Sequence, residues 1–338
     1  MKIPTPRKMS SGNWFIRLRL GNNSISVVAP TEKECRDKAA LIKAEHRAGK
    51  NTISFGADMT LGEMLDKYIA SKRDVLSPST VRGYTTVRRN NFASVMDKRF
   101  KDVKSWQSVI NAEAKLYSPK TIKNAWRFVC SALKEADVAV PKVVLPQLVP
   151  SEHPWLEPDE IKKFIAALEG QPHEIAALLA LHSMRRSEIL ALTWDKIDLK
   201  RGTIRISGAS VFNEDNKLIT KQTNKNASST RTIPIMIPAL RTALEAVENK
   251  SGPVVICNAN TIWARVNRTC RALDLPEVGV HGLRHSFASL AYHLGWSEQQ
   301  TMDIGGWSDT TTMHKIYTHL AAADRLKAQN SMAEFYTT

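Results

Sequence analysis

Two arginine-containing segments of the chain have residue types that could take part in chemistry. Arg185 ends a strongly apolar stretch and is followed three residues later by Glu188. An arginine beside apolar residues needs an anionic partner or a route to water, so a salt bridge to Glu188 is the ordinary interpretation and an oxyanion ligand is the functional one. His281 and Arg284 stand three residues apart, a spacing that favours one face of a helix.

The same segment could in principle hold a metal ion, because His281 and His285 are four residues apart. No carboxylate lies between them, as it does in the HExxH arrangement, and no cysteine is close in sequence. The cysteines are widely spaced and form no CxxC pair, which predicts neither a zinc ribbon nor a disulfide framework: Cys35, Cys130, Cys257 and Cys270. We expect reduced thiols, no metal and no soluble cofactor.

A nucleophile and a proton donor are also available. Tyr317 follows Trp307 by ten residues, and Lys225 lies in a polar loop before a strand-like segment at 230–235. A tyrosine in a terminal helix is ordinarily core or surface filler. A tyrosine hydroxyl can also attack phosphorus and remain attached as an ester.

Taken in order, these residues resemble the tyrosine recombinase (phage integrase) family, whose motifs run Arg, Lys, HxxR, His or Trp, and Tyr. The resemblance covers residues 155–325. The matching segments are Met184 to Glu188, Lys225 to Pro234, His281 to His285, Ile304 to Ser308, and Tyr317. Two positions depart from the usual pattern, since Trp307 stands where most of the family has histidine and Ser183 stands where glycine is usual.

The resemblance implies a role for each of these side chains. Tyr317 would form the covalent phosphotyrosine, Arg185 and Arg284 would bind the charged phosphate oxygens, and Trp307 would add a neutral donor. Lys225, or Lys221 four residues earlier, would protonate the leaving 5′-oxygen. His281 would exchange a proton with the tyrosine or hydrogen-bond the phosphate.

The overall charge indicates a polyanionic partner. Lysine and arginine outnumber aspartate and glutamate by 48 to 33, for a net charge of +15 and a pI near 9.7. Counterion release drives the binding of such proteins to phosphate backbones. No apolar run of about 18 residues and no signal-peptide pattern is visible, so we expect a soluble, intracellular protein.

The first 55 residues predict a small basic module. Residues 12–28 alternate as strands do, with Arg17 and Arg19 on the face opposite the apolar residues, and Thr31 with Glu34 favours the start of a helix. The module carries 11 Lys or Arg against 4 Asp or Glu. Residues 12–47 more weakly resemble the three-stranded arm-binding domain of integrases, so Arg17 and Arg19 are candidate DNA contacts.

Residues 56–139 predict an all-helical domain, which resembles the family's core-binding domain. Capping pairs at Thr60 and Glu63, Ser77-Pro78 and Ser118-Pro119 favour helix starts. The candidate DNA contacts here are Arg82, Arg88 and Arg89. Four prolines in residues 140–154 predict a linker.

Residues 155–338 are expected to form a mainly helical catalytic domain with a small antiparallel sheet and a C-terminal tail. Strands are expected at 203–206, 218–220 and 230–235. Helices are expected from Pro158, over 174–193 with a break at Met184 to Arg186, and around 238–249, 259–273, 281–294, 297–304 and 311–326. The chain as a whole is thus a multidomain α+β protein.

The leading interpretation is a site-specific recombinase that integrates and excises a phage or another mobile element. The resemblance implies a homotetramer on duplex DNA at core sites and arm sites, a host DNA-bending protein and an excision factor as further partners, and a place in the bacterial cytoplasm near the nucleoid. Two alternatives stay open, a type IB topoisomerase-like enzyme and a non-catalytic DNA-binding regulator.

Overall fold

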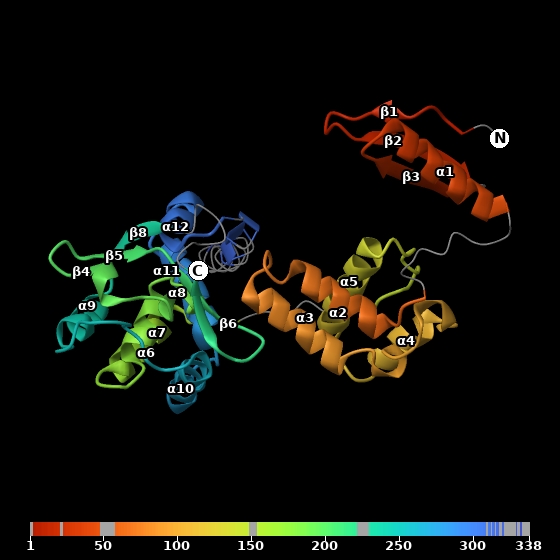
Figure 1. Cartoon of the computed structure of the whole chain (residues 1–338). Coiled ribbons are helices and arrows are strands. Elements are labelled where there is room, and N and C mark those ends of the chain that lie inside the picture. The colour runs from red at the N-terminus through yellow and green to blue at the C-terminus, as the bar shows by residue number, and fades with distance from the viewer. Residues whose placement is uncertain are drawn as a thin grey trace. The chain divides into compact units, whose positions relative to one another are not determined.

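The computed structural model describes residues 3–20, 23–47, 58–148, 154–221 and 230–308, together with nine single residues between 310 and 332. The chain forms two compact units, Met1–Val149 and Pro150–Thr338 (Figure 1). Each unit has hydrophobic clusters of its own. The mixed α+β class expected from the sequence is confirmed.

The beginning of the chain folds as a small antiparallel sheet with a helix. Strands β1 (Arg7–Lys8), β2 (Trp14–Leu20) and β3 (Asn23–Ala29) pair in the order β1-β2-β3, and α1 (Glu32–Arg47) follows. Strand alternation turns Ile16 and Leu18 into a core with residues of β3 and α1. The predicted three-stranded sheet is confirmed.

Residues 58–148 form a helical bundle. Its helices are α2 (Leu61–Lys72), α3 (Pro78–Asn90), α4 (Trp106–Glu113) and α5 (Pro119–Glu135), with short 3₁₀ turns η1 (Ala93–Val95) and η2 (Phe100–Asp102). Thr60 and Glu63 form the predicted reciprocal cap, and Ser118 caps α5. Helix α4 was not predicted, because its eight residues carry too short an apolar pattern.

The second unit is mainly helical with two small antiparallel sheets. Its elements are α6 (Pro158–Leu168), α7 (Glu174–Leu181), α8 (Arg186–Ile189), η3 (Trp194–Lys196), β4 (Ile197–Asp198), β5 (Thr203–Ile206), β6 (Ala209–Phe212), β7 (Leu218–Lys221), β8 (Arg231–Pro234), α9 (Pro238–Glu245), α10 (Ala259–Ala272), α11 (Gly279–His293) and α12 (Glu298–Gly305). Strands pair in the orders β4-β5-β8 and β6-β7.

Helix α7 occupies the centre of this unit. It packs against α6, α9, α10 and α11, and its residues from Ala176 to Leu181 are all buried. Helix α11 is also buried along most of its length, and its Ser286 hydroxyl accepts from the Leu156 amide at 2.8 Å. Arg284 lies on α11, and Arg185 follows the end of α7 by four residues, so the packing of these two helices in the core helps to fix both arginines.

Several elements differ from the sequence-based expectation. The helix predicted over 174–193 is broken, as expected, but the turn lies at Ser183, just before the predicted break, because its φ of +78° cannot continue an α-helix. Strand β6 was missed, and α11 begins two residues before His281. Of the expected helix at 311–326, the described residues 311, 313, 314, 316, 317 and 320 are helical.

No helix in the described part of the chain is long and apolar enough to cross a membrane. All four cysteines are free; Cys35 and Cys270 are buried, and Cys130 and Cys257 are partly exposed.

Candidate active site

The turn at Ser183 presents Arg185 at the N-terminus of α8. The Arg185 amide donates to Glu188 Oε2 at 2.8 Å, and its Nη1 donates to Glu188 Oε1 at 2.8 Å. Nη2 donates to the carbonyl oxygen of Gly306. The predicted ion pair with Glu188 is therefore confirmed, while 35% of the Arg185 side chain stays exposed. A partly exposed guanidinium held on one edge by a carboxylate can still meet an anion from solvent.

Arg284 is the most deeply buried cation of the site, with 1% of its surface exposed. Its Nη1 donates to the Ser183 carbonyl, and the Trp307 ring covers the guanidinium at 3.8 Å from Cζ to the ring centroid. Within the described residues, Nη2 is buried and has no hydrogen-bond partner. Burial, followed by the charge of Arg185, holds the pKa of Arg284 well below its usual value.

A buried guanidinium with an unused donor is costly, because a charge leaves water without full compensation. Guanidinium groups nevertheless stay protonated in proteins. Glu188 is the carboxylate that favours the charged form of Arg284, whereas Arg185 and Arg231 oppose it. The cluster therefore has three cations around one carboxylate, which suits an anionic ligand.

Arg231 belongs to this cluster and was not among the sequence candidates. Its Nη1 and Nη2 each lie 3.2 Å from one oxygen of Glu188, and its Nε donates to the Ile304 carbonyl at 3.0 Å. The sequence indicated that this side chain faces the core, because strand alternation places Arg231 on the same face as Ile233, which is 1% exposed. Burial would raise the pKa of Glu188, but the charges of Arg231 and Arg185 lower it overall.

His281 lies on the first turn of α11 and is exposed, whereas Arg284 on the next turn is buried. The two side chains thus differ in environment despite their helical spacing. The His281 and His285 rings meet edge to face, with centroids 4.5 Å apart. Across the described ranges, no group of three or more His, Cys, Asp or Glu side chains is placed to hold a metal ion.

Trp307 is positioned by the glycines that end α12. Gly306 has a φ of +68°, which turns the chain out of the helix. A Cβ at Gly305 would lie 1.8 Å from the Trp307 ring, so the indole packs directly on the backbone there. Trp307 also stacks on Phe287 at a centroid distance of 6.3 Å. The indole is therefore held between α11 and the end of α12, over Arg284.

Tyr317 is 9% exposed and shares an apolar cluster with Trp307. Its hydroxyl lies 2.6 Å from Thr301 Oγ1 and 3.3 Å from the Trp296 carbonyl. Burial raises the pKa of Tyr317, and the nearby Glu298 charge adds to the rise. The hydroxyl bonds to α12 and the loop before it, whereas the arginines bond to Ser183, Glu188 and Gly306.

The two lysine candidates differ in what the structure describes. Lys221 ends β7 and pairs across the hairpin with Ala209. Lys225 lies outside the described residues. The choice between them as the proton donor stays a prediction.

The candidate DNA contacts also differ from one another. Arg17 and Arg19 are exposed on β2, and Arg82 and Arg89 are exposed on α3. Arg88 instead binds Asp66 through two hydrogen bonds of 3.0 Å, joining α3 to α2.

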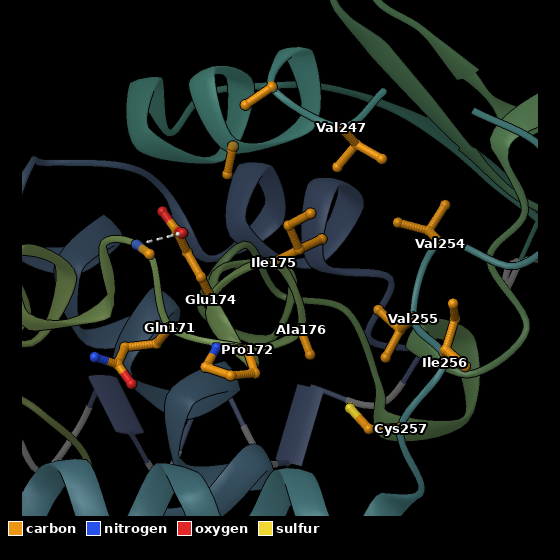
Figure 2. A pocket seen from close by; sticks show the side chains of 13 residues that line it. Gln171, Pro172, Glu174, Ile175, Ala176, Val247, Val254, Val255, Ile256 and Cys257 are labelled. Carbon is orange, nitrogen blue, oxygen red and sulfur yellow. Dashed lines mark hydrogen bonds between the residues drawn. The ribbon is translucent and has the colours of Figure 1, made fainter. Parts of the chain in front are cut away.

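A pocket of about 600 Å³ lies elsewhere in the second unit (Figure 2). The start of α7, the end of α9 and residues 254–257 form its apolar walls, with Ile175, Val247 and Ile256 among the lining side chains. None of the candidate catalytic residues lines it. The arginine cluster is thus separate from this hollow.

Comparison with known proteins identifies the class of fold. A model of the phage integrase family matches residues 154–324. The integrase of Salmonella phage P22 is 25% identical over 194 residues, which are 54% of this chain and 47% of the relative. The chain thus spans about half the length of that curated relative.

Solved structures show the same fold. A Tn1549 transposon integrase in complex with transposon right end DNA has a TM-score of 0.63 at 19% identity, covering 80% of this chain and 100% of that one. A lambda integrase dimer bound to a COC′ core site has a TM-score of 0.55 at 15% identity, covering 93% and 94%. The family match and the shared fold together show that this chain belongs to the phage integrase family of tyrosine recombinases.

Proposed function

We propose that this chain is a site-specific recombinase that cuts and rejoins duplex DNA through a 3′-phosphotyrosine at Tyr317. The observation that carries the proposal is the buried Arg284, whose Nη2 has no acceptor among the described residues, beside the partly exposed Arg185. This pair offers guanidinium donors for an anion, one of them buried and the other partly open to solvent. A scissile phosphate in DNA has the matching charge and oxygen geometry.

The arginines would act on the charge that builds up during cleavage. As the phenolic oxygen attacks phosphorus, negative charge gathers on the nonbridging oxygens, and guanidinium donors bind it most strongly at that moment. The Trp307 ring, which packs on the Arg284 guanidinium, would hold it in place, and the indole N–H would donate to the phosphate. A preorganised donor is worth roughly 3 to 4 kcal/mol in other enzymes, so removal of either arginine should lower the cleavage rate by about 10²- to 10³-fold.

The reaction exchanges one ester bond to phosphorus for another, so the number of ester bonds stays the same. A bond forms between the Tyr317 oxygen and phosphorus while the bond to the 5′-oxygen breaks, and the phenolic proton goes to a base. The leaving oxygen takes a proton from a general acid, for which we propose Lys225, with Lys221 as the alternative. His281 is suited to accept the phenolic proton or to donate to the phosphate, because it is exposed on the first turn of α11. A 5′-hydroxyl then attacks phosphorus and gives its proton to the deprotonated general acid, while the bond to the Tyr317 oxygen breaks and the tyrosine regains its proton from the base that had taken it.

The remaining parts of the chain would hold the DNA. We propose residues 1–55 as an arm-type DNA-binding domain, 56–139 as a core-binding domain, 140–154 as a linker and 155–338 as the catalytic domain. The basic charge and the exposed arginines of β2 and α3 support this division.

We further propose that four copies assemble on two duplexes in the bacterial cytoplasm, with a host DNA-bending protein and an excision factor as accessory partners. A related lambda integrase has been solved as a tetramer bound to a Holliday junction, with a TM-score of 0.56 at 16% identity.

A suicide substrate tests the proposed chemistry. A duplex selected from a random library by binding to the full chain would be nicked near the cleavage point, so that the cut fragment diffuses away and the adduct accumulates. We expect wild type to form a covalent protein–DNA adduct and Arg284→Ala to form almost none while still binding the duplex. Binding without any adduct from wild type would favour the regulator, and relaxation of plasmids that lack the selected site would favour the topoisomerase-like enzyme.

A further inference from the structure

Arg231 is a buried cation to which the proposed reaction assigns no role. It begins β8 and pairs across the sheet with Ile206 of β5, and 8% of its side chain is exposed. Its Nε, Nη1 and Nη2 each have a hydrogen-bond acceptor inside the protein. A guanidinium occupied in this way is poorly placed to bind a phosphate itself.

The contacts of Arg231 join three segments that are distant in sequence. Its two Nη atoms bind both oxygens of Glu188 on α8, and its Nε binds the Ile304 carbonyl near the end of α12. The same Glu188 carboxylate also binds the amide and the guanidinium of Arg185. Arg231 therefore fixes the carboxylate that orients Arg185.

Arg231 also lies against the turn that presents Trp307. A Cβ at Gly306 would be 2.6 Å from the Arg231 Cζ atom, which shows how closely the guanidinium approaches this backbone. The Gly306 carbonyl accepts from Arg185, and the next residue, Trp307, covers Arg284. Arg231 thus supports Arg185, which is partly exposed, and also the turn that holds Trp307 over the buried Arg284.

We propose that Arg231 is a positioning residue of the phosphate site, which holds Glu188 and the turn at 304–307 so that Arg185 and Arg284 meet the scissile phosphate in the correct geometry. This inference rests on the proposed function. In metal sites, removing a side chain that orients a ligand changes activity by about 10- to 100-fold, and we expect a similar range for a side chain that orients a phosphate-binding arginine. A purely structural ion pair would instead affect stability without regard to the charge of the substrate.

The test compares two substrates that differ in charge at the scissile phosphate. One is the ordinary suicide duplex, and the other carries a methylphosphonate at the cleavage position, which removes the charge of one nonbridging oxygen. Single-turnover adduct formation would be measured for wild type, Arg231→Ala and Arg231→Lys. Arg241→Ala is the matched control, because Arg241 also pairs with a glutamate, Glu245, at 2.8 Å but lies on the exposed face of α9.

We expect Arg231→Ala to slow adduct formation on ordinary DNA by about 10- to 100-fold and on the methylphosphonate by less than about threefold, because an uncharged phosphorus centre needs little help from the arginines. Arg231→Lys should fall between wild type and alanine on ordinary DNA, since it keeps the charge but loses the two-point contact. Arg241→Ala should match wild type on both substrates.

Equal losses on the two substrates, or no loss on either, would overturn the positioning role. If Arg231→Ala does not fold, Arg231→Lys carries the comparison, because it keeps the buried charge. Failure of wild type to form an adduct would instead reject the proposed function, so the two failures can be told apart.

Discussion

The contact between Tyr317 and Thr301 predicts that cleavage begins with the release of the nucleophile. Thr301 is fully buried, and its Oγ1 lies 2.6 Å from the Tyr317 hydroxyl, where either hydroxyl can donate to the other. We expect the phenol to leave this contact before it attacks a phosphate. Thr301→Val keeps the shape of the side chain but removes this hydrogen bond. The lost hydrogen bond is worth about 1 kcal/mol, or about a fivefold shift towards the released tyrosine.

Single-turnover adduct formation on the suicide duplex measures this effect. We expect Thr301→Val to react about fivefold faster than wild type when release of the tyrosine precedes a slower chemical step. Thr301→Ser is the control, since it keeps the hydroxyl and should react at the wild-type rate. Slower cleavage by Thr301→Val, with Thr301→Ser unchanged, would show that the contact helps the reaction and would refute this reasoning.

Three further predictions concern stability and DNA binding. Burial lowers the pKa of His182 from 6.5 to about 4, so its contribution to stability is complete above pH 6.5 and is lost as the pH falls towards 4. Between pH 7 and pH 5 the free energy of unfolding should therefore fall by about 2 kcal/mol more in wild type than in His182→Gln, measured by urea unfolding at each pH. An equal pH dependence in the two proteins would contradict this. Gly306→Ala should lower the melting temperature and the adduct yield, because of its φ of +68° and its clash with Arg231; wild-type values would argue against the proposed packing. Arg89→Ala should reduce the slope of log affinity against log salt by about one, whereas Arg88→Ala, which loses a salt bridge to α2, should mainly lower stability; the reverse pattern would exchange their roles.

Local sequence signals predicted the starts of helices and the longer strands correctly. Thr60 with Glu63 and Ser118 before Pro119 act within a single helical turn, so their effect does not depend on the rest of the fold. The alternation in residues 12–28 likewise predicted β2 and β3. The break after α7 was predicted at Met184 to Arg186, but the turn residue is Ser183, whose positive φ is sparsely populated by serine.

The candidate site was only partly predictable, because its contacts cross long stretches of chain. Arg231 is 43 residues from Glu188 and 73 from Ile304, so no local spacing reveals that the three meet. The sequence indicated the type and order of the arginine motifs, and the structure adds their environments. Arg284 is buried under Trp307, and Arg185 is partly exposed.

The most direct measurement is identification of the protein side chain that becomes joined to DNA. Adduct trapped on the suicide duplex would be digested with nuclease and protease, and the modified peptide would be sequenced by mass spectrometry. We expect one phosphorylated residue, Tyr317, bearing a 3′-linked nucleotide, and no adduct from Tyr317→Phe. A nucleotide found on a different side chain, or an adduct that persists in Tyr317→Phe, would contradict it.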